Sequence, residues 1–526
     1  MNRKLPVGIQ DFVKIREEAY CYVDKTPRIY DLVTGAAGPV FLSRPRRFGK
    51  SLLCSTLGAL FEGRRELFTA AAGRPPLAID SLDWEWKKYP VIRLDLNPGD
   101  YSLGTAILDS QLNIMLEWHE KKYDLTPGTP NDSAGRFRQL ITHVTEKTGQ
   151  RAVVIVDEYD KPLLSTIDMP NVHKKIRSAL KAFYGVLKSS DAYLHLVFLT
   201  GVTKFSQVSI FSDLNNITDI SLNPRFYDLC GITQEELERD FAGEITAVLG
   251  GRDRQAYLGE VKRFYNGYRF SRNPGTVYNP FGLLKHFDEG GEFNAYWFAT
   301  GTPAFLIRLI EDQKIDILNL EKKSIAPSSF QKFSVDSMDA LAVLYQSGYL
   351  TITGYDNEFG IYTLDYPNEE VRASFAEALL EHYVRASAAE LDSLALMLPQ
   401  SFARGDVETV MRSLESFFAS IPYDIQLRDE RYYQTVVHLI FRMLGLRCRS
   451  EVRIAAGRID TLVETKDYVY CFEFKLDGTA EQALAQIDGK DYLLPWAGNV
   501  KGLFKIGVNF DYTKRNIGEW KCSAGA

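Results

Sequence analysis

Short apolar runs alternate with helical stretches between Pro39 and Thr200. The runs cover residues 40–43, 91–96, 152–156 and 196–200. Runs that are largely apolar from end to end, without strict alternation, are typical of parallel strands covered on both faces. The pattern predicts an α/β domain over residues 1–233 with a parallel sheet flanked by helices. After Thr233 the pattern becomes helical, which predicts a helical lid over residues 234–330.

A helix and a β-hairpin are predicted after the lid. The helical pattern covers residues 337–346 and ends at Gly348, because glycine readily takes the left-handed conformation of a helix cap. Two strands around Asp356 then cover residues 349–355 and 361–366. This combination favours a winged-helix-like segment over residues 331–380. An unrelated α+β connector is an equally good interpretation.

The remainder of the chain predicts helices and then a second α/β domain. Residues 381–424 have a helical pattern and are expected to form a connector. Residues 425–526 begin with a long helix at 430–444, whose apolar positions form one stripe, and continue with strands. The whole pattern therefore predicts an α/β multidomain protein.

Length, charge and cysteine use limit the possible functions. A chain of 526 residues is too long for one hydrophobic core. The formal net charge of −6 excludes a globally basic nucleic-acid coat and leaves a local basic groove open. The six cysteines contain no C-x-x-C pair, which argues against structural zinc and a disulfide framework. The sequence shows no signal peptide and no run of about 18 apolar residues, so we expect a cytoplasmic protein with no membrane partner.

A phosphate-binding motif follows the first apolar run. Arg44-Pro-Arg-Arg-Phe-Gly-Lys-Ser51 matches the P-loop pattern G-x-x-x-x-G-K-[ST] except at its first position, where Arg44 replaces glycine. Lys50 is expected to reach the outer phosphates of ATP and Ser51 to bind Mg²⁺, while Gly49 lets the backbone approach closely. The backbone N–H groups of the same loop complete the predicted nucleotide site, at Arg46, Arg47 and Phe48.

Two carboxylates end the third apolar run. Asp157 is expected to bind the Mg²⁺ of the nucleotide, and Glu158 to orient the attacking water. A buried strand that merely ends in acidic loop residues is the alternative, and the pairing with Gly49-Lys50-Ser51 favours the catalytic interpretation. Thr200, at the tip of the next run, is a candidate sensor of the γ-phosphate. A plain strand-to-loop transition explains Thr200 equally well.

A second set of charged residues lies in the C-terminal domain. Asp460 precedes Glu473 by thirteen residues, and the strand period of two places Glu473 and Lys475 on one face. Two carboxylates can hold Mg²⁺ or Mn²⁺, and a lysine beside them can orient or activate water, as phosphodiester hydrolysis requires. Glu430, on the preceding helix, is a further candidate metal ligand, and Gln486, on the following helix, a further candidate catalytic residue. A structural ion pair between Glu473 and Lys475 is the competing interpretation.

These motifs resemble those of bacterial and archaeal AAA-ATPase-like proteins that carry a C-terminal PD-(D/E)XK nuclease-superfamily domain. The similar segments span most of the chain: 5–12, 22–26, 44–51, 265–268, 278–281, 296–297, 457–460 and 473–475. The resemblance implies a P-loop NTPase sheet with its lid, followed by an α/β/α nuclease-like domain. It also implies ATP binding, a Mg²⁺-dependent P-loop and an intact nuclease site. The segments 265–268, 278–281 and 296–297 have no chemical explanation at this level.

Two principal functions remain open from the sequence. The first is an ATP-regulated nuclease that acts on DNA or RNA. The second is a nucleotide-controlled signalling or assembly ATPase whose C-terminal domain binds nucleic acid or a partner without cutting. An interaction protein without turnover is a third hypothesis, and the intact carboxylates and lysines count against it. A homo-oligomer is compatible with either principal function.

Overall fold

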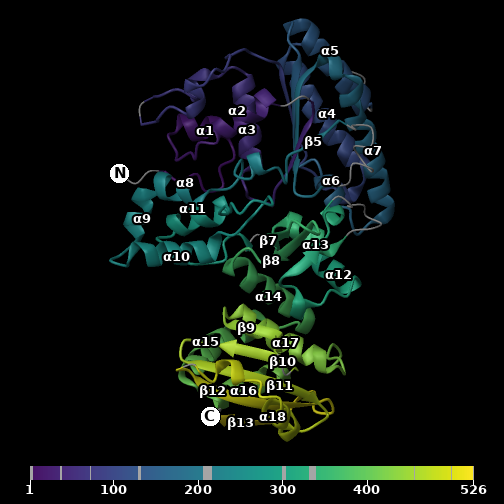
Figure 1. Ribbon diagram of the computed structural model, residues 1–526. Coiled ribbons are helices and arrows are strands. Elements are labelled where there is room, and N and C mark those ends of the chain that lie inside the picture. The colour runs from purple at the N-terminus through teal and green to yellow at the C-terminus, as the bar shows by residue number, and fades with distance from the viewer. Residues whose placement is uncertain are drawn as a thin grey trace. The chain divides into compact units, whose positions relative to one another are not determined.

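The computed structural model describes residues 4–35, 38–71, 73–127, 132–204, 216–298, 304–330, 339–454, 457–498 and 500–524. The chain divides into two compact units (Figure 1). One unit contains residues 1–299 and 324–368, and the other contains residues 300–323 and 369–526. The expected boundaries after residues 330 and 380 do not coincide with this division, because the chain enters the second unit at residue 300, leaves it at 324 and returns at 369.

The first unit contains a five-stranded parallel sheet. Its strands are β1 (Val40–Ser43), β2 (Val91–Asp95), β3 (Ala152–Asp157), β4 (Leu194–Gly201) and β5 (Thr218–Asp219), in the order β2-β3-β4-β1-β5. The pairings between these described strands are all parallel, so the predicted parallel sheet is confirmed. The residues of β3 are all buried, which explains its uninterrupted apolar sequence.

The strand order explains how helices cover the sheet. The connection from β1 to β2 runs in the opposite direction to the connections from β2 to β3, β3 to β4 and β4 to β5. Right-handed crossovers therefore place α3 (Lys50–Phe61) on one face and the later helices on the other. The later helices are α4 (Thr105–Lys122), α5 (Ser133–Thr148) and α7 (Pro170–Ser189), which Figure 1 shows together on the side away from α1 (Phe12–Glu17), α2 (Thr26–Gly35) and α3.

In the region that the sequence predicts as a lid, 234–330, α12 (Ala304–Asp312) belongs to the second unit, and four described α-helices belong to the first. These four are α8 (Gln234–Asp240), α9 (Ala242–Val248), α10 (Arg254–Tyr265) and α11 (Pro280–Asp288). The first helix begins at a capping box, in which the Thr233 hydroxyl accepts from the N–H of Glu236 and the Glu236 carboxylate accepts from the N–H of Thr233. Their shared core includes Leu237, Phe241 and Tyr265, and Cys21 of the N-terminal segment packs into it.

The hairpin segment also belongs to the first unit. Helix α13 (Ala340–Ser347) ends at Gly348, whose φ of +92° is the expected left-handed cap. Strands β7 (Thr351–Asp356) and β8 (Ile361–Asp365) pair in antiparallel fashion, and β6 (Lys323–Ile325) adds a third strand beside β8. The helix and hairpin are confirmed. The expected first residues of the helix, 337 and 338, lie outside the described residues, and the winged-helix assignment stays a prediction.

The second unit contains a mixed sheet of five strands. These are β9 (Arg447–Ile454), β10 (Gly457–Glu464), β11 (Tyr468–Leu476), β12 (Gly502–Asp511) and β13 (Asn516–Ala524), in the order β13-β12-β11-β10-β9. Strands β11 and β12 are parallel, and the other neighbours are antiparallel. Helix α18 (Ala480–Gly489) connects the parallel pair, as a parallel connection requires.

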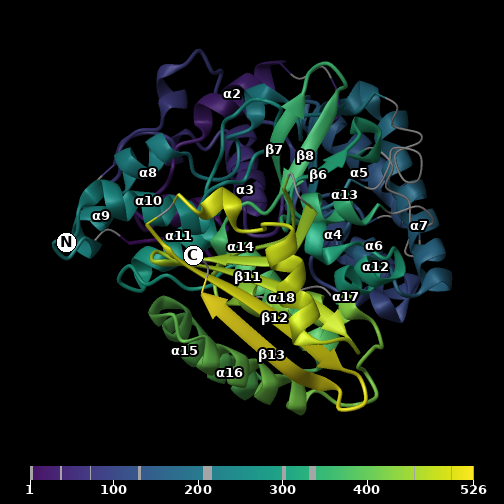
Figure 2. The same ribbon diagram turned by 60° about the horizontal axis from the view of Figure 1, so that its bottom comes forward.

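Helices cover both faces of this sheet (Figure 2). Helix α17 (Glu430–Met443), predicted at 430–444, packs the Phe441 ring 5.5 Å from that of Phe472. On the opposite face, α18 approaches β12 so closely that a Cβ on Gly507 would lie 2.4 Å from the Ala480 carbonyl oxygen. Helices α12 (Ala304–Asp312), α14 (Glu369–Val384), α15 (Ala388–Arg404) and α16 (Val407–Ser420) complete the unit. The architecture is the expected α/β/α arrangement.

Candidate functional sites

The P-loop connects β1 to the N-terminus of α3. Gly49 is the N-cap of α3 with φ of +90°, and no side chain caps the helix there. The first N–H groups of the helix and its dipole therefore favour an anion at this end. The Lys50 Nζ is 3% exposed and lies 3.1 Å from the Arg44 carbonyl oxygen, 3.2 Å from that of Pro45 and 3.3 Å from the Glu158 Oε1.

The predicted Mg²⁺ ligands Ser51 and Asp157 meet at the end of β3. The Ser51 side chain hydrogen-bonds to Asp157, while burial raises the pKa of Asp157 to about 6 despite that bond. The next residue, Glu158, has a φ of +49° and donates its N–H to the Asp157 Oδ1 at 3.0 Å. A non-glycine residue with this backbone conformation is uncommon and is found most often at functional sites. The structure thus brings Lys50, Ser51, Asp157 and Glu158 together.

Arg44 explains why the loop does not need glycine at its first position. The guanidinium is buried and donates to the carbonyls of Ser43 at 2.8 Å, Ser221 at 2.9 Å and Phe226 at 2.9 Å. Its Cζ also lies 4.2 Å from the centre of the Phe270 ring. The side chain therefore fixes the turn that glycine freedom allows in the ordinary motif. Burial lowers the pKa of Arg44 from its usual value.

Three motifs without a chemical explanation in the sequence surround the middle of the loop. The Trp297 Nε1 donates to the Arg46 carbonyl at 3.1 Å, and the Arg47 guanidinium lies 3.8 Å from the centre of the Phe281 ring. The Phe48 ring is buried, with its centre 4.7 Å from that of Tyr268 and 5.3 Å from that of Phe270. Aromatic residues of the segments 265–268, 278–281 and 296–297, together with Phe270, thus support the loop. The side chain of Phe48 packs, and only its backbone is available to phosphate.

Thr200 lies within β4 and does not face the loop. Its hydroxyl is fully buried and donates to the Leu42 carbonyl at 2.8 Å, across the β1–β4 pair. The expected role as a γ-phosphate sensor stays a prediction: in this structure the hydroxyl donates to β1, and the residue has no exposed surface. Beyond the end of the strand, Thr203 donates to Asp160, which is also fully buried.

A small apolar cavity adjoins the loop and was not foreseen from the sequence. It measures about 100 Å³ and lies beside Gly49 and Leu52, with Tyr22, Ile29 and Ile232 among its lining residues. Its size and apolar walls suit one edge of a planar base next to the phosphate site. The segment 22–26, which resembles a motif of the family, was the feature of the sequence that could have indicated this cavity.

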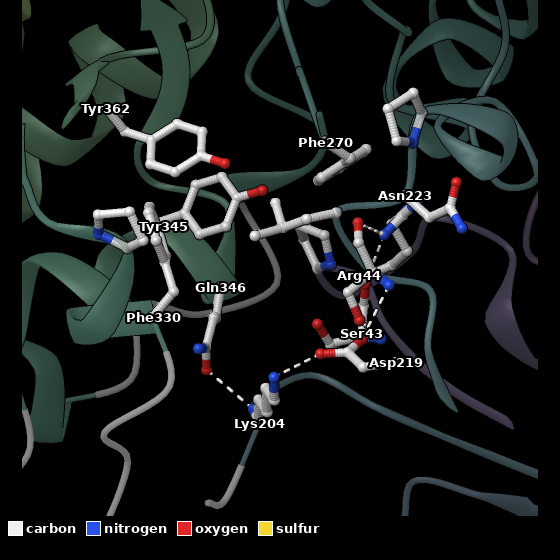
Figure 3. Close-up of a pocket in the computed structure, with 15 residues that line it drawn as sticks. Ser43, Arg44, Lys204, Asp219, Asn223, Phe270, Phe330, Tyr345, Gln346 and Tyr362 are labelled. Carbon is white, nitrogen blue, oxygen red and sulfur yellow. Dashed lines mark hydrogen bonds and ion pairs between the residues drawn. The ribbon is translucent and has the colours of Figure 1, made fainter. Parts of the chain in front are cut away.

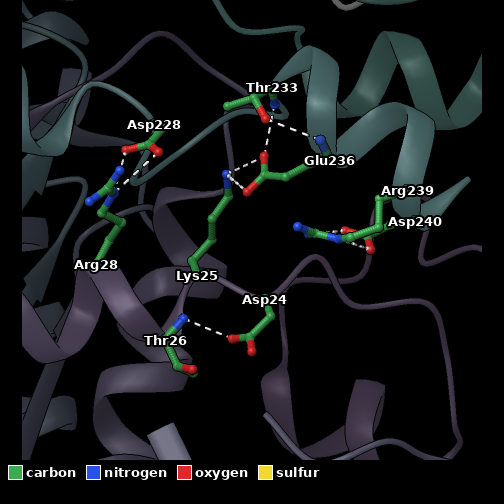
Figure 4. Close-up of polar contacts among 9 residues, drawn as sticks. All are labelled: Asp24, Lys25, Thr26, Arg28, Asp228, Thr233, Glu236, Arg239 and Asp240. Atoms are coloured by element: carbon green, nitrogen blue, oxygen red, sulfur yellow. Dashed lines mark hydrogen bonds and ion pairs between the residues drawn. The ribbon is translucent and has the colours of Figure 1, made fainter. Parts of the chain in front are cut away.

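Ion pairs connect the N-terminal side of this cavity to α8 and to Asp228, which precedes the predicted lid (Figure 4). The Lys25 Nζ lies 2.7 Å from both carboxylate oxygens of Glu236, and the Arg28 Nε lies 3.0 Å from the Asp228 Oδ1. Asp24 accepts from the N–H of Thr26 at 2.8 Å. Lys25 also lines the cavity, so the pair with Glu236 holds α8 against its rim.

In the second unit, the strand register brings the two predicted carboxylates together. Thr461 is paired with Phe472 in the antiparallel β10–β11 ladder, which places Asp460 opposite Glu473 and on the same face. The Asp460 Oδ2 accepts from the N–H of Phe474 at 2.9 Å. Asp460 is 9% exposed and Glu473 1% exposed. Burial raises the pKa of Asp460 to about 6 and that of Glu473 to about 7, and the mutual repulsion adds to the shift of Glu473.

Lys475 and Gln486 both contact the buried Glu473. The Lys475 Nζ lies 3.1 Å from the Glu473 Oε1, and the Gln486 Nε2 from α18 donates to the same oxygen. Gln486 also donates to the Tyr492 hydroxyl at 3.2 Å. The Glu473 Oε2 is buried and has no hydrogen-bond partner among the described residues. An unsatisfied buried carboxylate oxygen is costly unless a ligand completes it, and a hard divalent cation suits it.

Glu430 does not complete a three-carboxylate cluster. Its Oε2 accepts from the backbone N–H of Leu476 at 3.1 Å, so the side chain bonds to the end of β11. Across the described ranges, no three His, Cys, Asp or Glu side chains converge into a ready-made metal site. The charge of Glu430 nevertheless contributes to raising the pKa of both Asp460 and Glu473, and its role as a metal ligand stays a prediction. His438 is a packed residue of α17, with its Nδ1 2.6 Å from the Ser450 hydroxyl.

Comparison with known proteins identifies similar sequences over both units. Residues 6–211 match the family described as Predicted AAA-ATPase, and residues 428–520 match the PD-(D/E)XK nuclease superfamily. An uncharacterized protein in the vnfD 5′ region of Azotobacter chroococcum mcd 1 is 38% identical over 527 aligned positions, which cover 98% of each chain. No helix in the part of the chain that the structure describes has the length and apolarity needed to cross a membrane.

Proposed function

We propose that this chain, which belongs to the family of AAA-ATPase-like proteins with a C-terminal PD-(D/E)XK nuclease-superfamily domain, is an ATP-controlled, metal-dependent nuclease. One observation carries the nuclease part of the proposal. Asp460 and Glu473 are buried opposite each other, Lys475 contacts one Glu473 oxygen, and the other Glu473 oxygen has no partner among the described residues. Burying charged groups in this way lowers the stability of a fold, whereas the same carboxylates can bind the metal ion of a metal-assisted reaction.

At the P-loop, the residues suit ATP with Mg²⁺. Ser51 and Asp157 would hold Mg²⁺, which would offset the charge of the phosphates. Lys50 would move its Nζ from the loop carbonyls and Glu158 to the phosphates. Glu158, released from that ion pair, would then orient a water for attack on the terminal phosphate. The backbone N–H groups at the start of α3 would bind phosphate oxygens.

At the C-terminal site, Asp460 and Glu473 would hold Mg²⁺ or Mn²⁺. A divalent ion there would offset the repulsion between the carboxylates and polarise the phosphodiester. Gln486 holds the Glu473 Oε1 from α18 and so fixes the direction of the carboxylate. Lys475, with a partly exposed side chain, would orient the attacking water and stabilise charge that develops on the phosphate.

The test uses the full-length protein with single- and double-stranded DNA and RNA. Cleavage is measured with Mg²⁺, Mn²⁺ or EDTA, each with and without ATP. Lys475→Ala should lower cleavage at least a hundredfold, and Asp460→Asn should also weaken metal binding in calorimetry. Lys505→Ala is the matched control, because Lys505 is a lysine of the same sheet that pairs with Asp488 instead. If Lys475→Ala cuts as well as the parent, the nuclease proposal is wrong.

The ATPase part is tested separately. Lys50→Ala should abolish ATP binding, because it removes a fixed cation and its hydrogen bonds to the phosphates. Glu158→Gln should retain binding and slow hydrolysis, since only the water-orienting base is lost. Equal ATP affinity of Lys50→Ala and the parent in calorimetry would contradict the assignment of the P-loop.

A second candidate function follows from the position of Glu430. Without a third convergent carboxylate among the described residues, the C-terminal unit can bind nucleic acid without cutting it. The protein would then be a nucleotide-controlled switch. Nucleic-acid binding in a gel-shift assay that changes with ATP, together with no cleavage under any metal condition, would favour this function over the nuclease.

A further inference from the structure

A large cavity lies in the first unit, on the β5 side of the P-loop (Figure 3). It measures about 740 Å³, within the range of roughly 300–1,000 Å³ typical of small-molecule sites. One wall is formed by the end of β1 and the segment 219–224. The other wall is formed by α13, β8 and residues near Phe330.

This cavity is distinct from the nucleotide site. Lys50, Ser51, Asp157 and Glu158 do not line it, and it shares no lining residue with the small apolar cavity beside Gly49. The Phe48 ring, which lines the small cavity, packs edge-on against the Phe270 ring, which lines the large one, and this contact separates the two spaces.

Aromatic rings form one side of the cavity. The Phe330 ring lies edge-on to that of Tyr345, with centres 4.9 Å apart, and to that of Tyr362, with centres 5.2 Å apart. Figure 3 shows the Tyr345 and Tyr362 rings with their hydroxyls directed to the middle of the space. Neither hydroxyl has a hydrogen-bond partner among the described residues. Rings fixed in this way offer stacking surfaces to a planar ligand.

The polar groups at the cavity are mainly donors. The Gln346 Oε1 accepts from the Lys204 N–H at 2.9 Å, which leaves the Gln346 amide NH₂ without a partner among the described residues. Asp219 is the only carboxylate among the described lining residues, and it is paired with the Lys204 Nζ at 2.5 Å. The Arg44 guanidinium is committed to three backbone carbonyls and covered by Phe270.

These features restrict the class of ligand. Among the described lining residues, the neutralised Lys204–Asp219 pair and the committed Arg44 leave no free cation for a phosphate, and one paired carboxylate is too few for a metal ion. The unpaired hydroxyls and amide argue against an apolar ligand such as an acyl chain. A planar heteroaromatic ring that carries hydrogen-bond acceptors satisfies both the stacking surfaces and the donors.

We infer that this cavity binds a nucleobase whose edge is rich in acceptors, such as guanine or uracil, at a site separate from the P-loop. Adenine matches less well, because on the edge where guanine presents the two acceptors N7 and O6, adenine presents N7 and a donor amine, whereas the free hydroxyls and amide of the cavity can all donate. The base can belong to a free nucleotide or to a single-stranded nucleic acid. The site adjoins the P-loop, since Arg44 and Pro45 line the cavity and their carbonyls accept from Lys50.

The experiment measures binding to the full-length Lys50→Ala variant, so that the P-loop does not contribute. Guanosine, uridine and adenosine, their 5′-monophosphates and short homopolymeric single strands are titrated by calorimetry. Guanosine and uridine ligands should bind at least tenfold more tightly than adenosine ligands. Tighter binding of monophosphates than of strands would show that the bound base belongs to a free nucleotide. Tighter binding of strands would show that it belongs to a single-stranded nucleic acid.

Three further variants locate the binding. Gln346→Glu keeps the acceptor for Lys204 and removes the NH₂ donors, while Tyr345→Phe and Tyr362→Phe remove only hydroxyls. Each should weaken binding about fivefold to tenfold, as expected for the loss of one hydrogen bond. Tyr355→Phe is the control, because its ring lies 4.6 Å from that of Tyr362 but does not line the cavity.

Two outcomes would overturn the inference. One is that the folded Lys50→Ala variant, checked by circular dichroism, binds none of these ligands. The other is that Gln346→Glu and both Tyr→Phe variants bind as tightly as Tyr355→Phe. Loss of ATPase or nuclease activity is measured independently, so failure of the proposed function would not affect this result.

Discussion

Restoring the ordinary P-loop glycine at Arg44 should damage the site. Arg44→Gly removes a guanidinium that donates to three carbonyls at 2.8–2.9 Å and lies over Phe270. It also adds backbone freedom at the turn out of β1, which the folded state must lose. We therefore expect lower stability of the first unit and weaker ATP binding, although the variant matches the P-loop pattern better than the parent does.

The magnitude follows from the groups left behind. The Ser221 and Phe226 carbonyls lose a donor in a buried environment, at a cost of about 1–3 kcal/mol each. Relief from burying the guanidinium, the burial that lowers the pKa of Arg44, offsets part of this loss. We expect a net destabilisation of about 3 kcal/mol, near the upper end of common single substitutions.

The assay is urea denaturation followed by circular dichroism, with ATP affinity from calorimetry. Arg46→Gly is the matched control, since its side chain is exposed in the same loop, and it should change stability by less than about 1 kcal/mol. ATP should bind Arg44→Gly at least tenfold more weakly than the parent. If Arg44→Gly is as stable as Arg46→Gly and binds ATP as tightly as the parent, the bonding role assigned to Arg44 is wrong.

Three other predictions test separate features. In EDTA, Glu473→Gln should stabilise the second unit by about 3 kcal/mol at pH 8 and much less at pH 5. Burial raises the pKa of Glu473 from its usual 4.5 to about 7, so the parent loses stability as the pH rises through this range. Equal effects on the free energy of unfolding at both pH values would contradict this. Trp297→Phe removes the donor to the Arg46 carbonyl and should weaken ATP binding about fivefold in calorimetry, whereas Trp520→Phe on β13 should not. If ATP controls assembly, light scattering should give different masses with ADP and with a non-hydrolysable ATP analogue. A single mass with both nucleotides would exclude control through assembly.

The sequence predicted the features that depend on local pattern. Buried parallel strands need apolar residues on both faces, so β1, β3 and β4 were readable as runs. Side chains on a strand return to the same face every two residues, and Asp460 and Glu473 lie on neighbouring antiparallel strands. The spacing of the two carboxylates therefore predicted a shared site.

Features that depend on distant partners were not predictable. The partners of Arg44 are backbone carbonyls of Ser221 and Phe226, and a carbonyl leaves no mark on a sequence. Thr200 looked available at a strand tip, but its acceptor is the Leu42 carbonyl on the neighbouring strand. Glu430 was placed on the correct helix, while its direction depends on the end of β11.

The ion pairs of Lys25 and Arg28 with residues far along the chain also constrain how the chain is made. Arg28 and Asp228 are separated by 200 residues, and Lys25 and Glu236 by 211. At about 5–20 residues per second, a ribosome takes roughly 10–40 s to synthesise that interval. Strand β1 meanwhile has neither of its neighbours, because β4 and β5 are synthesised late in the same interval. The first unit therefore assembles late in translation, and chains truncated before residue 236 should aggregate instead of forming a smaller ATPase.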